Sequence, residues 1–169
     1  MKNVSRLLPL LSGIVTLSGC SHAPQKSNGQ NNQKPNIIYI FADDLGIGDL
    51  SCYGATKVST PNIDRLAGQG VQFTNAYATS ATSTPSRFGL LTGMYPWRQE
   101  NTEIAPGNSE LIIDTTCVTM ADMLKDAGYA TGAVGKWHLG LGPKGETDFN
   151  NRITPNAQSI GFDYEFTIP

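Results

Sequence analysis

Residues 83–93 read Ser-Thr-Pro-Ser-Arg-Phe-Gly-Leu-Leu-Thr-Gly, and the interpretation of the whole chain starts from this stretch. Pro85 suits the first turn of a helix, where its missing N–H costs nothing, and Gly93 is a typical helix stop. Ser83 is therefore expected at a helix N-terminus, where unpaired N–H groups and the helix dipole attract an anion. Arg87 lies one turn later, so its guanidinium can reach the same point. The alternative is a capped helix with a buried arginine and no ligand.

A pair of acidic residues follows a predicted core strand. The run Asn-Ile-Ile-Tyr-Ile-Phe-Ala at 36–42 is typical of a strand buried on both faces of a parallel sheet. Asp43 and Asp44 come directly after it, at the strand end where open α/β sheets bind ligands. Adjacent carboxylates repel unless a cation lies between them, and their oxygens suit Ca²⁺ or Mg²⁺. An Asx turn followed by a helix cap is the alternative.

The next segments favour an α/β fold. A helix is predicted over 60–67, with Thr60 as N-cap and Pro61 at its first position. Alternating apolar residues predict a strand over 71–78, which leads to the Ser83 helix. Two strand–helix units in succession are typical of α/β architecture.

A second candidate site stretch is Gly-Lys-Trp-His at 135–138. In a strand, Lys136 and His138 would point to the same side, where they could grip an anion and move a proton. The alternative is an exposed lysine and a histidine at the edge of the core. Because His22 is the only other histidine, a zinc site built from several histidines is excluded within these residues.

These stretches together resemble a known family. Residues 83–93 resemble the signature of the type I sulfatases: Cys or Ser, any residue, Pro, Ser, Arg, two residues, then Leu-Leu-Thr-Gly. Residues 35–50 resemble the opening of the same family, and 135–140 resemble its second signature. The resemblance implies an alkaline-phosphatase-like α/β fold with a mostly parallel sheet flanked by helices. Residues 35–169 would form the N-terminal, truncated part of this catalytic domain.

The resemblance also implies an activity, that of a sulfuric ester hydrolase acting on a sulfated glycan or aryl sulfate. It implies that a maturation enzyme converts Ser83 to formylglycine, by anaerobic radical chemistry when the residue is Ser. One hydroxyl of the hydrated aldehyde would attack sulfur, and the other would restore the aldehyde and expel sulfate. The family's metal ion would acidify one hydroxyl and hold the sulfate.

Site residues carry over from the family position by position. Asp43, Asp44 and residue 83 would bind Ca²⁺ or Mg²⁺. Arg87 would hold the formylglycine hydrate, Lys136 would neutralise sulfate charge, and His138 would act as the base. The family's further ligands, an Asp–Asn pair and a late His and Lys, have no counterpart among residues 1–169, so activity is expected to need them from elsewhere.

Two other functions remain open at this point. A metal-dependent phosphatase or phosphodiesterase of the same superfamily would use unmodified Ser83 as its nucleophile. An inactive, lipid-anchored, truncated remnant would have no enzymatic role.

The N-terminal residues predict export and anchoring. Residues 1–19 have basic residues followed by an apolar run too short to span a bilayer, as in a signal peptide. The run Leu-Ser-Gly-Cys at 17–20 resembles a bacterial lipobox, with Cys20 as the lipid-bearing residue. Residues 20–34 read as a flexible tether. The prediction is a protein lipid-anchored in the bacterial cell envelope, on the periplasmic or outer-surface side; a soluble secreted protein is the alternative.

Composition limits the partners. The chain has 12 basic and 14 acidic residues, a net charge of −2, so no nucleic-acid partner is expected. Its 169 residues suit one modest domain. A disulfide between Cys52 and Cys117 is permitted outside the cytoplasm, and the sequence leaves it open.

Overall fold

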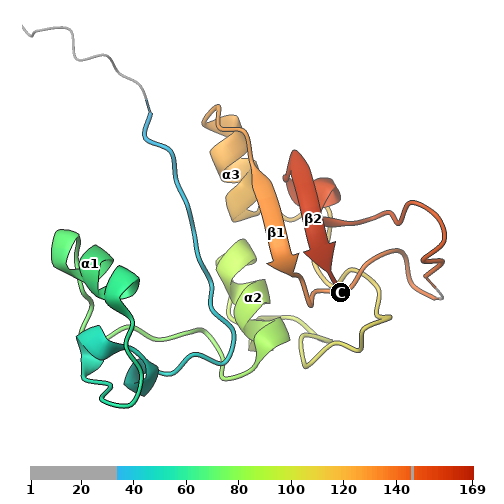
Figure 1. The fold of residues 1–169 in the computed structure, drawn as a ribbon. Coiled ribbons are helices and arrows are strands. Elements are labelled where there is room, and N and C mark those ends of the chain that lie inside the picture. The colour runs from blue at the N-terminus through green and yellow to red at the C-terminus, as the bar shows by residue number, and fades with distance from the viewer. Residues whose placement is uncertain (1–33, 146) are drawn as a thin grey trace, which may run out of the picture. The chain divides into compact units, whose positions relative to one another are not determined.

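The computed structural model describes residues 34–145 and 147–169. Among these residues, 34–41 belong to one unit and Ala42–Pro169 form a second, compact unit. The second unit holds the helices α1 (Pro61–Gln69), α2 (Ser83–Thr92) and α3 (Met120–Asp126) and the strands β1 (Gly132–Lys136) and β2 (Tyr164–Ile168) (Figure 1). Short 3-10 turns lie between them: η1 (Ile47–Asp49), η2 (Ser51–Tyr53), η3 (Pro96–Arg98) and η4 (Ala157–Ile160).

The strands β1 and β2 form a parallel two-stranded sheet, in register from Gly132 opposite Tyr164 to Lys136 opposite Ile168. They lie side by side and point the same way in Figure 1. The pairing continues one residue past β1, where the Trp137 N–H donates to the Ile168 carbonyl at 2.8 Å. Of the predicted α/β sheet, the structure contains these two parallel strands.

The prediction of strands over 36–42 and 71–78 is wrong for this structure, because neither segment is a strand. A strand needs a neighbouring strand to satisfy its backbone N–H and C=O groups, and the sheet found among the described residues contains β1 and β2 but neither of these segments. Their apolar side chains are correspondingly exposed, Ile38 at 86% and Val71 at 79%. The predicted mostly parallel sheet flanked by helices is therefore reduced to two strands in the part of the chain described.

The predicted helices form close to their expected bounds. Thr60 precedes α1 with Pro61 at its first position, although the Thr60 hydroxyl bonds Ser51 and Asp64 rather than the helix N–H groups. Gly93 ends α2 in the left-handed conformation at φ 67°, and its N–H donates to the Gly89 carbonyl at 3.0 Å.

Helix α2 is fixed by the main core, which also holds the chain just after β1. Phe88 on α2 and Leu139 after β1 are both fully buried. Trp137 lies in the same core and packs edge-on against Phe162, with ring centroids 6.3 Å apart. The buried members of this core are Phe88, Leu91, Ile113, Trp137, Leu139, Ala157 and Ile160. Since these contacts hold α2 against the end of β1, they bring the residues around Ser83 and Lys136 together.

Cys52 and Cys117 are free thiols. Across residues 34–145 and 147–169, no helix is both long and apolar enough to cross a membrane. The predicted signal peptide over 1–19, the lipid-bearing Cys20 and the tether up to residue 33 lie outside the described residues.

Candidate active site

The N-terminal turn of α2 brings a hydroxyl and a guanidinium together. Ser83 is the first residue of the helix, and Thr82, the N-cap residue, makes no side-chain capping hydrogen bond. Arg87 Nε donates to Ser83 Oγ at 2.9 Å, one turn along the helix. The contact is the one that the spacing of residues 83 and 87 predicted.

Two further charged residues meet the Arg87 side chain. Arg87 Nη1 donates to the Lys136 carbonyl at 2.7 Å, and Arg87 Nη2 lies 3.7 Å from Asp43 Oδ1. The Lys136 ammonium donates to Asp43 Oδ2. One cluster thus contains Asp43, Arg87 and Lys136, which come from three segments far apart in the sequence. Arg87 lies on α2, Lys136 ends β1, and Asp43 follows the run 36–42 that the sequence predicts as a strand.

The charges in this cluster act on the Asp43 carboxyl group. The hydrogen bond from Lys136 lowers the pKa of Asp43, and the positive charges of Lys136 and Arg87 lower this pKa further. Partial desolvation opposes these effects. The Asp43 side chain remains 38% exposed, so solvent also screens the pair. The carboxylate is therefore the form that is present at neutral pH.

Asp44 does not join this cluster. It makes no hydrogen bond or ion pair with any residue that the structure describes. Its backbone is left-handed at φ 53°, a conformation that Asp tolerates better than most residues. Asp43 and Asp44 are thus adjacent in sequence but differently engaged.

The candidate metal-ligating side chains carry the type of ligand atom that a hard cation takes. Asp43, Asp44 and Ser83 offer only oxygen atoms, the ligands that Ca²⁺ and Mg²⁺ take. No group of three or more His, Cys, Asp or Glu side chains suited to a metal is found among the described residues. Because Ca²⁺ takes about six to eight oxygens, these residues would supply only part of its shell.

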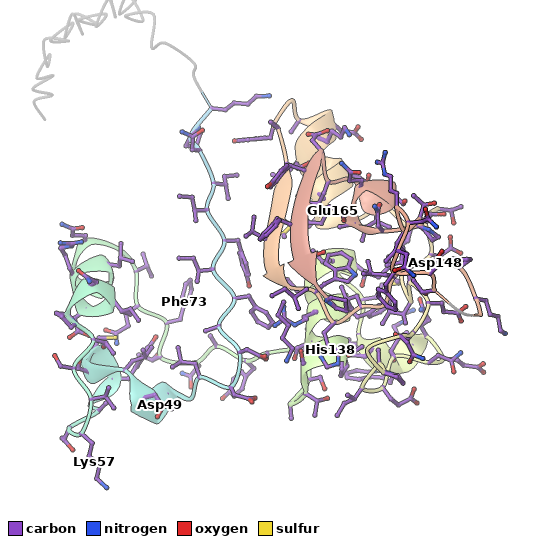
Figure 2. All side chains as sticks on the ribbon, turned by 45° about the vertical axis from the view of Figure 1, so that its right-hand side comes forward. Asp49, Lys57, Phe73, His138, Asp148 and Glu165 are labelled. Carbon is purple, nitrogen blue, oxygen red and sulfur yellow. The ribbon has the colours of Figure 1, made fainter. Side chains whose placement is uncertain are left out.

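His138 lies just past β1, beside α2 (Figure 2). The prediction that Lys136 and His138 share one strand face is wrong, because β1 ends at Lys136 and His138 adopts a left-handed backbone at φ 54°. His138 Nε2 lies 3.0 Å from the Ala105 carbonyl. A carbonyl oxygen can only accept, so Nε2 carries a proton. Nδ1 is buried and has no hydrogen-bond partner in the described residues.

Sequence reasoning missed Thr84, which occupies the unspecified position of the signature. Its side chain is fully buried and its hydroxyl donates to the His138 carbonyl at 2.9 Å. The same oxygen accepts from the Ala105 N–H at 3.1 Å. No pattern in the sequence marks this role, because Ala105 lies in an irregular segment with no periodicity. Gly89 is constrained for a plainer reason, because a Cβ there would overlap the Thr79 side chain.

Taken together, the residues define the class of site. A hydroxyl stands at a helix N-terminus with a guanidinium bonded to it, an ammonium is paired with the carboxylate that the guanidinium also faces, and an imidazole whose Nδ1 has no partner in the described residues follows β1. This arrangement suits a hydrolase that handles an anionic ester.

Comparison with known proteins identifies the family. The model of the sulfatase family matches residues 35–167. The chain belongs to the sulfatase family, which is alkaline-phosphatase-like, and the resemblance inferred from the motifs is confirmed.

Two curated relatives illustrate the range of similarity. The N-acetylgalactosamine-6-O-sulfatase of Bacteroides thetaiotaomicron is 89% identical over all 169 residues, which correspond to 33% of that protein. Human arylsulfatase A is 49% identical over 115 residues, covering 66% of this chain and 22% of that protein. The chain thus spans about a third or less of these relatives and is truncated with respect to them.

Solved structures agree with the assignment to the sulfatase family. A chain from work on glycosaminoglycan metabolism by Bacteroides thetaiotaomicron matches with a TM-score of 0.80 and 93% identity, covering 81% of this chain and 28% of that one. The crystal structure of Ps i-CgsB in complex with k-i-k-neocarrahexaose matches with a TM-score of 0.67 and 38% identity, covering 81% and 29%. The fold seen here is therefore that of the N-terminal part of a sulfatase.

Proposed function

We propose that this chain is the N-terminal part of a sulfatase that hydrolyses a sulfuric ester of a sulfated glycan. The observation that carries the proposal is the hydrogen bond from Arg87 to Ser83 at the start of α2, inside a complete family signature. A simple aryl sulfate is the alternative substrate class.

The relative at 89% identity supports a narrower substrate. That protein is named an N-acetylgalactosamine-6-O-sulfatase. The proposed substrate here is the 6-sulfate of an N-acetylgalactosamine residue within a glycosaminoglycan. Residues corresponding to the remaining length of that relative would complete the pocket that selects it.

Each site residue has a proposed role consistent with its contacts. Ser83 is the residue that a maturation enzyme converts to formylglycine, and Arg87, already bonded to its oxygen, orients the new hydroxyl groups. Lys136 neutralises charge on the sulfate. His138 accepts a proton at Nδ1, the nitrogen that has no partner within the described segments.

Asp43, Asp44 and residue 83 are the proposed ligands of Ca²⁺ or Mg²⁺, with the remaining ligands from water and the rest of the protein. The bound ion would supply Lewis-acid activation of a hydroxyl and would help to hold the sulfate. Asp43 contributes a carboxylate that neighbouring cations already keep ionised.

We also propose that the protein is anchored in the bacterial envelope through a lipid on Cys20, after removal of residues 1–19, with residues 20–34 as its tether. The support is the sequence of this segment alone. Anchoring would hold the folded part from residue 35 onward at a surface where glycans are degraded.

The test uses the chain extended to the full length of its relatives and made together with a maturation enzyme. Mass spectrometry of the peptide spanning Ala81 to Arg87 should show the loss of two hydrogens at position 83. The same preparation should release sulfate from 6-sulfated N-acetylgalactosamine. Ser83→Ala should abolish release, a loss of several orders of magnitude, while the protein stays folded. Ser80→Ala is the matched control and should retain activity.

Two outcomes would replace the proposal. Phosphate-ester cleavage by an unmodified Ser83, without sulfate release, would favour the phosphatase. Absence of any hydrolysis by a folded, metal-loaded and modified protein would favour the inactive remnant.

A further inference from the structure

Thr84 joins three parts of the site through a single oxygen atom. Its hydroxyl hydrogen goes to the His138 carbonyl at 2.9 Å, and its oxygen receives the Ala105 N–H at 3.1 Å. The residue is fully buried, so water does not compete for either hydrogen bond. A hydroxyl is the smallest group that donates and accepts at once, so this position uses both functions of a threonine.

The two partners of Thr84 are also partners of each other. The Ala105 carbonyl accepts the proton of His138 Nε2 at 3.0 Å. Thr84 therefore holds the backbone of His138 on one side and, on the other, the residue whose carbonyl receives the ring proton. The result is a closed triangle of three hydrogen bonds among Thr84, Ala105 and His138.

This triangle of hydrogen bonds determines which ring nitrogen of His138 is unprotonated. With Nε2 protonated toward Ala105, the lone pair of a neutral imidazole lies on Nδ1. Nδ1 is buried and has no hydrogen-bond partner in the described residues, so no neighbouring donor there occupies its lone pair. His138 also has a left-handed backbone at φ 54°, a conformation that is uncommon overall but that His adopts more often than most residues.

We propose that Thr84 is a positioning residue that fixes His138 in the tautomer with the proton on Nε2 and the lone pair on Nδ1. It does so by holding the Ala105 carbonyl and the His138 backbone in place. The tautomer follows from the contacts alone, whereas its use as a proton acceptor in sulfate-ester hydrolysis rests on the proposed function.

The principal test measures the tautomer rather than the activity. The protein, extended to the full length of its relatives, is labelled with ¹⁵N-histidine, and long-range ¹H–¹⁵N spectra report which ring nitrogen is protonated. The His138 signals are assigned by their loss in His138→Gln. The wild-type protein should show His138 protonated on Nε2 only. Thr84→Ser, which keeps the hydroxyl, should show the same pattern.

Thr84→Val removes the hydroxyl at nearly constant shape and should give a mixture of tautomers or protonation on Nδ1. Thr92→Val is the matched control, because Thr92 lies on the same helix and, within the described part of the chain, its hydroxyl bonds just the Phe88 carbonyl and the Met94 N–H. That variant should keep the wild-type pattern. Thermal unfolding establishes that each variant is folded, and Thr84→Ala replaces Thr84→Val if the latter does not fold.

A kinetic readout separates positioning from binding. Thr84→Val should lower kcat by about 10- to 100-fold, part of the effect of a general base, with KM changed by less than about threefold. Thr84→Ser should recover most of kcat. The formylglycine content of each variant is measured by mass spectrometry, so that poor maturation is not mistaken for poor positioning.

Several results would overturn the proposal. One is a folded Thr84→Val protein in which His138 is still protonated on Nε2 only. Another is a wild-type protein with the proton on Nδ1. Failure of both Thr84→Val and Thr84→Ala to fold would make the residue structural instead. A wild-type protein with the expected tautomer but no sulfate release would overturn the proposed function and leave the role of Thr84 intact.

Discussion

Arg87 and Ser83 are joined across one turn of α2 by a hydrogen bond of 2.9 Å from Nε to Oγ. The other guanidinium nitrogens face the Lys136 carbonyl and the Asp43 carboxylate. Because the guanidinium is planar and presents donors on several edges, one side chain makes all three contacts. Arg87 therefore orients residue 83 while two other segments hold Arg87 itself.

Replacing Arg87 with lysine tests this geometry at constant charge. A lysine ammonium has no planar fork and cannot keep the three contacts together. In the full-length, modified protein, Arg87→Lys should lower the rate of sulfate release by about 100- to 1,000-fold, as for the loss of a donor at a reacting oxygen. Steady-state kinetics measures the effect. Arg98→Lys, at an exposed position in η3, is the control. Rates within threefold of wild type for Arg87→Lys would contradict the role.

The proposed metal ligands are tested by metal content. Asp43→Asn and Asp44→Asn each remove a charged oxygen ligand, so each variant should bind less Ca²⁺ or Mg²⁺ and should lose metal-dependent activity. Elemental analysis after dialysis against a fixed metal concentration gives the stoichiometry. Asp126→Asn, at an exposed position on α3, should bind metal normally. Unchanged stoichiometry in both ligand variants would exclude these residues from the site.

Gly140 is predicted to be intolerant of any side chain. Its backbone is left-handed at φ 72°, and a Cβ there would overlap the backbone carbonyl of Glu110. Since neither backbone segment can yield as a flexible side chain would, Gly140→Ala should lower the free energy of unfolding by about 3 kcal/mol or more. Urea unfolding measures the change. Gly107→Ala, where an added Cβ meets nothing within 4 Å, should change it by less than about 0.5 kcal/mol.

The ion pair between Lys125 and Asp163 predicts a pH dependence of stability. The hydrogen bonds from Lys125 and from the Thr131 N–H lower the pKa of Asp163 below 3.8, its value when unfolded. A lowered pKa adds stability that is present above the unfolded value and is lost as pH falls through the folded one. Asp163→Asn should therefore be less stable than wild type at neutral pH, and the difference should shrink below about pH 4. A difference that grows on acidification would refute this assignment.

The lipid anchor depends on one residue. Cys20→Ala should leave the protein unprocessed at residue 19 or release it from the membrane fraction, because the acyl chains that hold it are attached through that thiol. Fractionation followed by mass spectrometry of the N-terminal peptide measures both effects. Cys52→Ala is the control and should fractionate like wild type. Normal processing and full membrane retention of Cys20→Ala would show that the anchor lies elsewhere.

Local signals allowed the helices and the Ser83–Arg87 contact to be predicted from the sequence. Pro61 and Pro85 mark helix starts, Gly93 marks a stop, and a four-residue spacing on a helix brings two side chains together. Each of these features depends on neighbours within one or two turns, so a short window of sequence contains the needed information.

The wrong predictions involve distant partners. The apolar run at 36–42 has the composition of a buried strand, but it is not one without a neighbouring strand to pair with. The placement of His138 on a strand face failed because β1 ends two residues earlier, where the chain turns to bury Trp137. The link of Thr84 to Ala105 and His138 spans 21 and 54 positions, and no sequence periodicity reports such contacts.

The parallel pairing of β1 with β2 has a consequence for the order in which the protein assembles. Gly132 pairs with Tyr164, so the polypeptide must close a loop of roughly 30 residues before the first rung of this sheet can form. During synthesis, which proceeds at about 5 to 20 residues per second, β1 leaves the ribosome seconds before its partner. Over that interval β1 has no partner strand, and α2, a helix of 10 residues, lacks part of the core that holds it in the finished structure. The helix that carries Ser83 is therefore fully packed only after Ile160, a member of that core, has been synthesised.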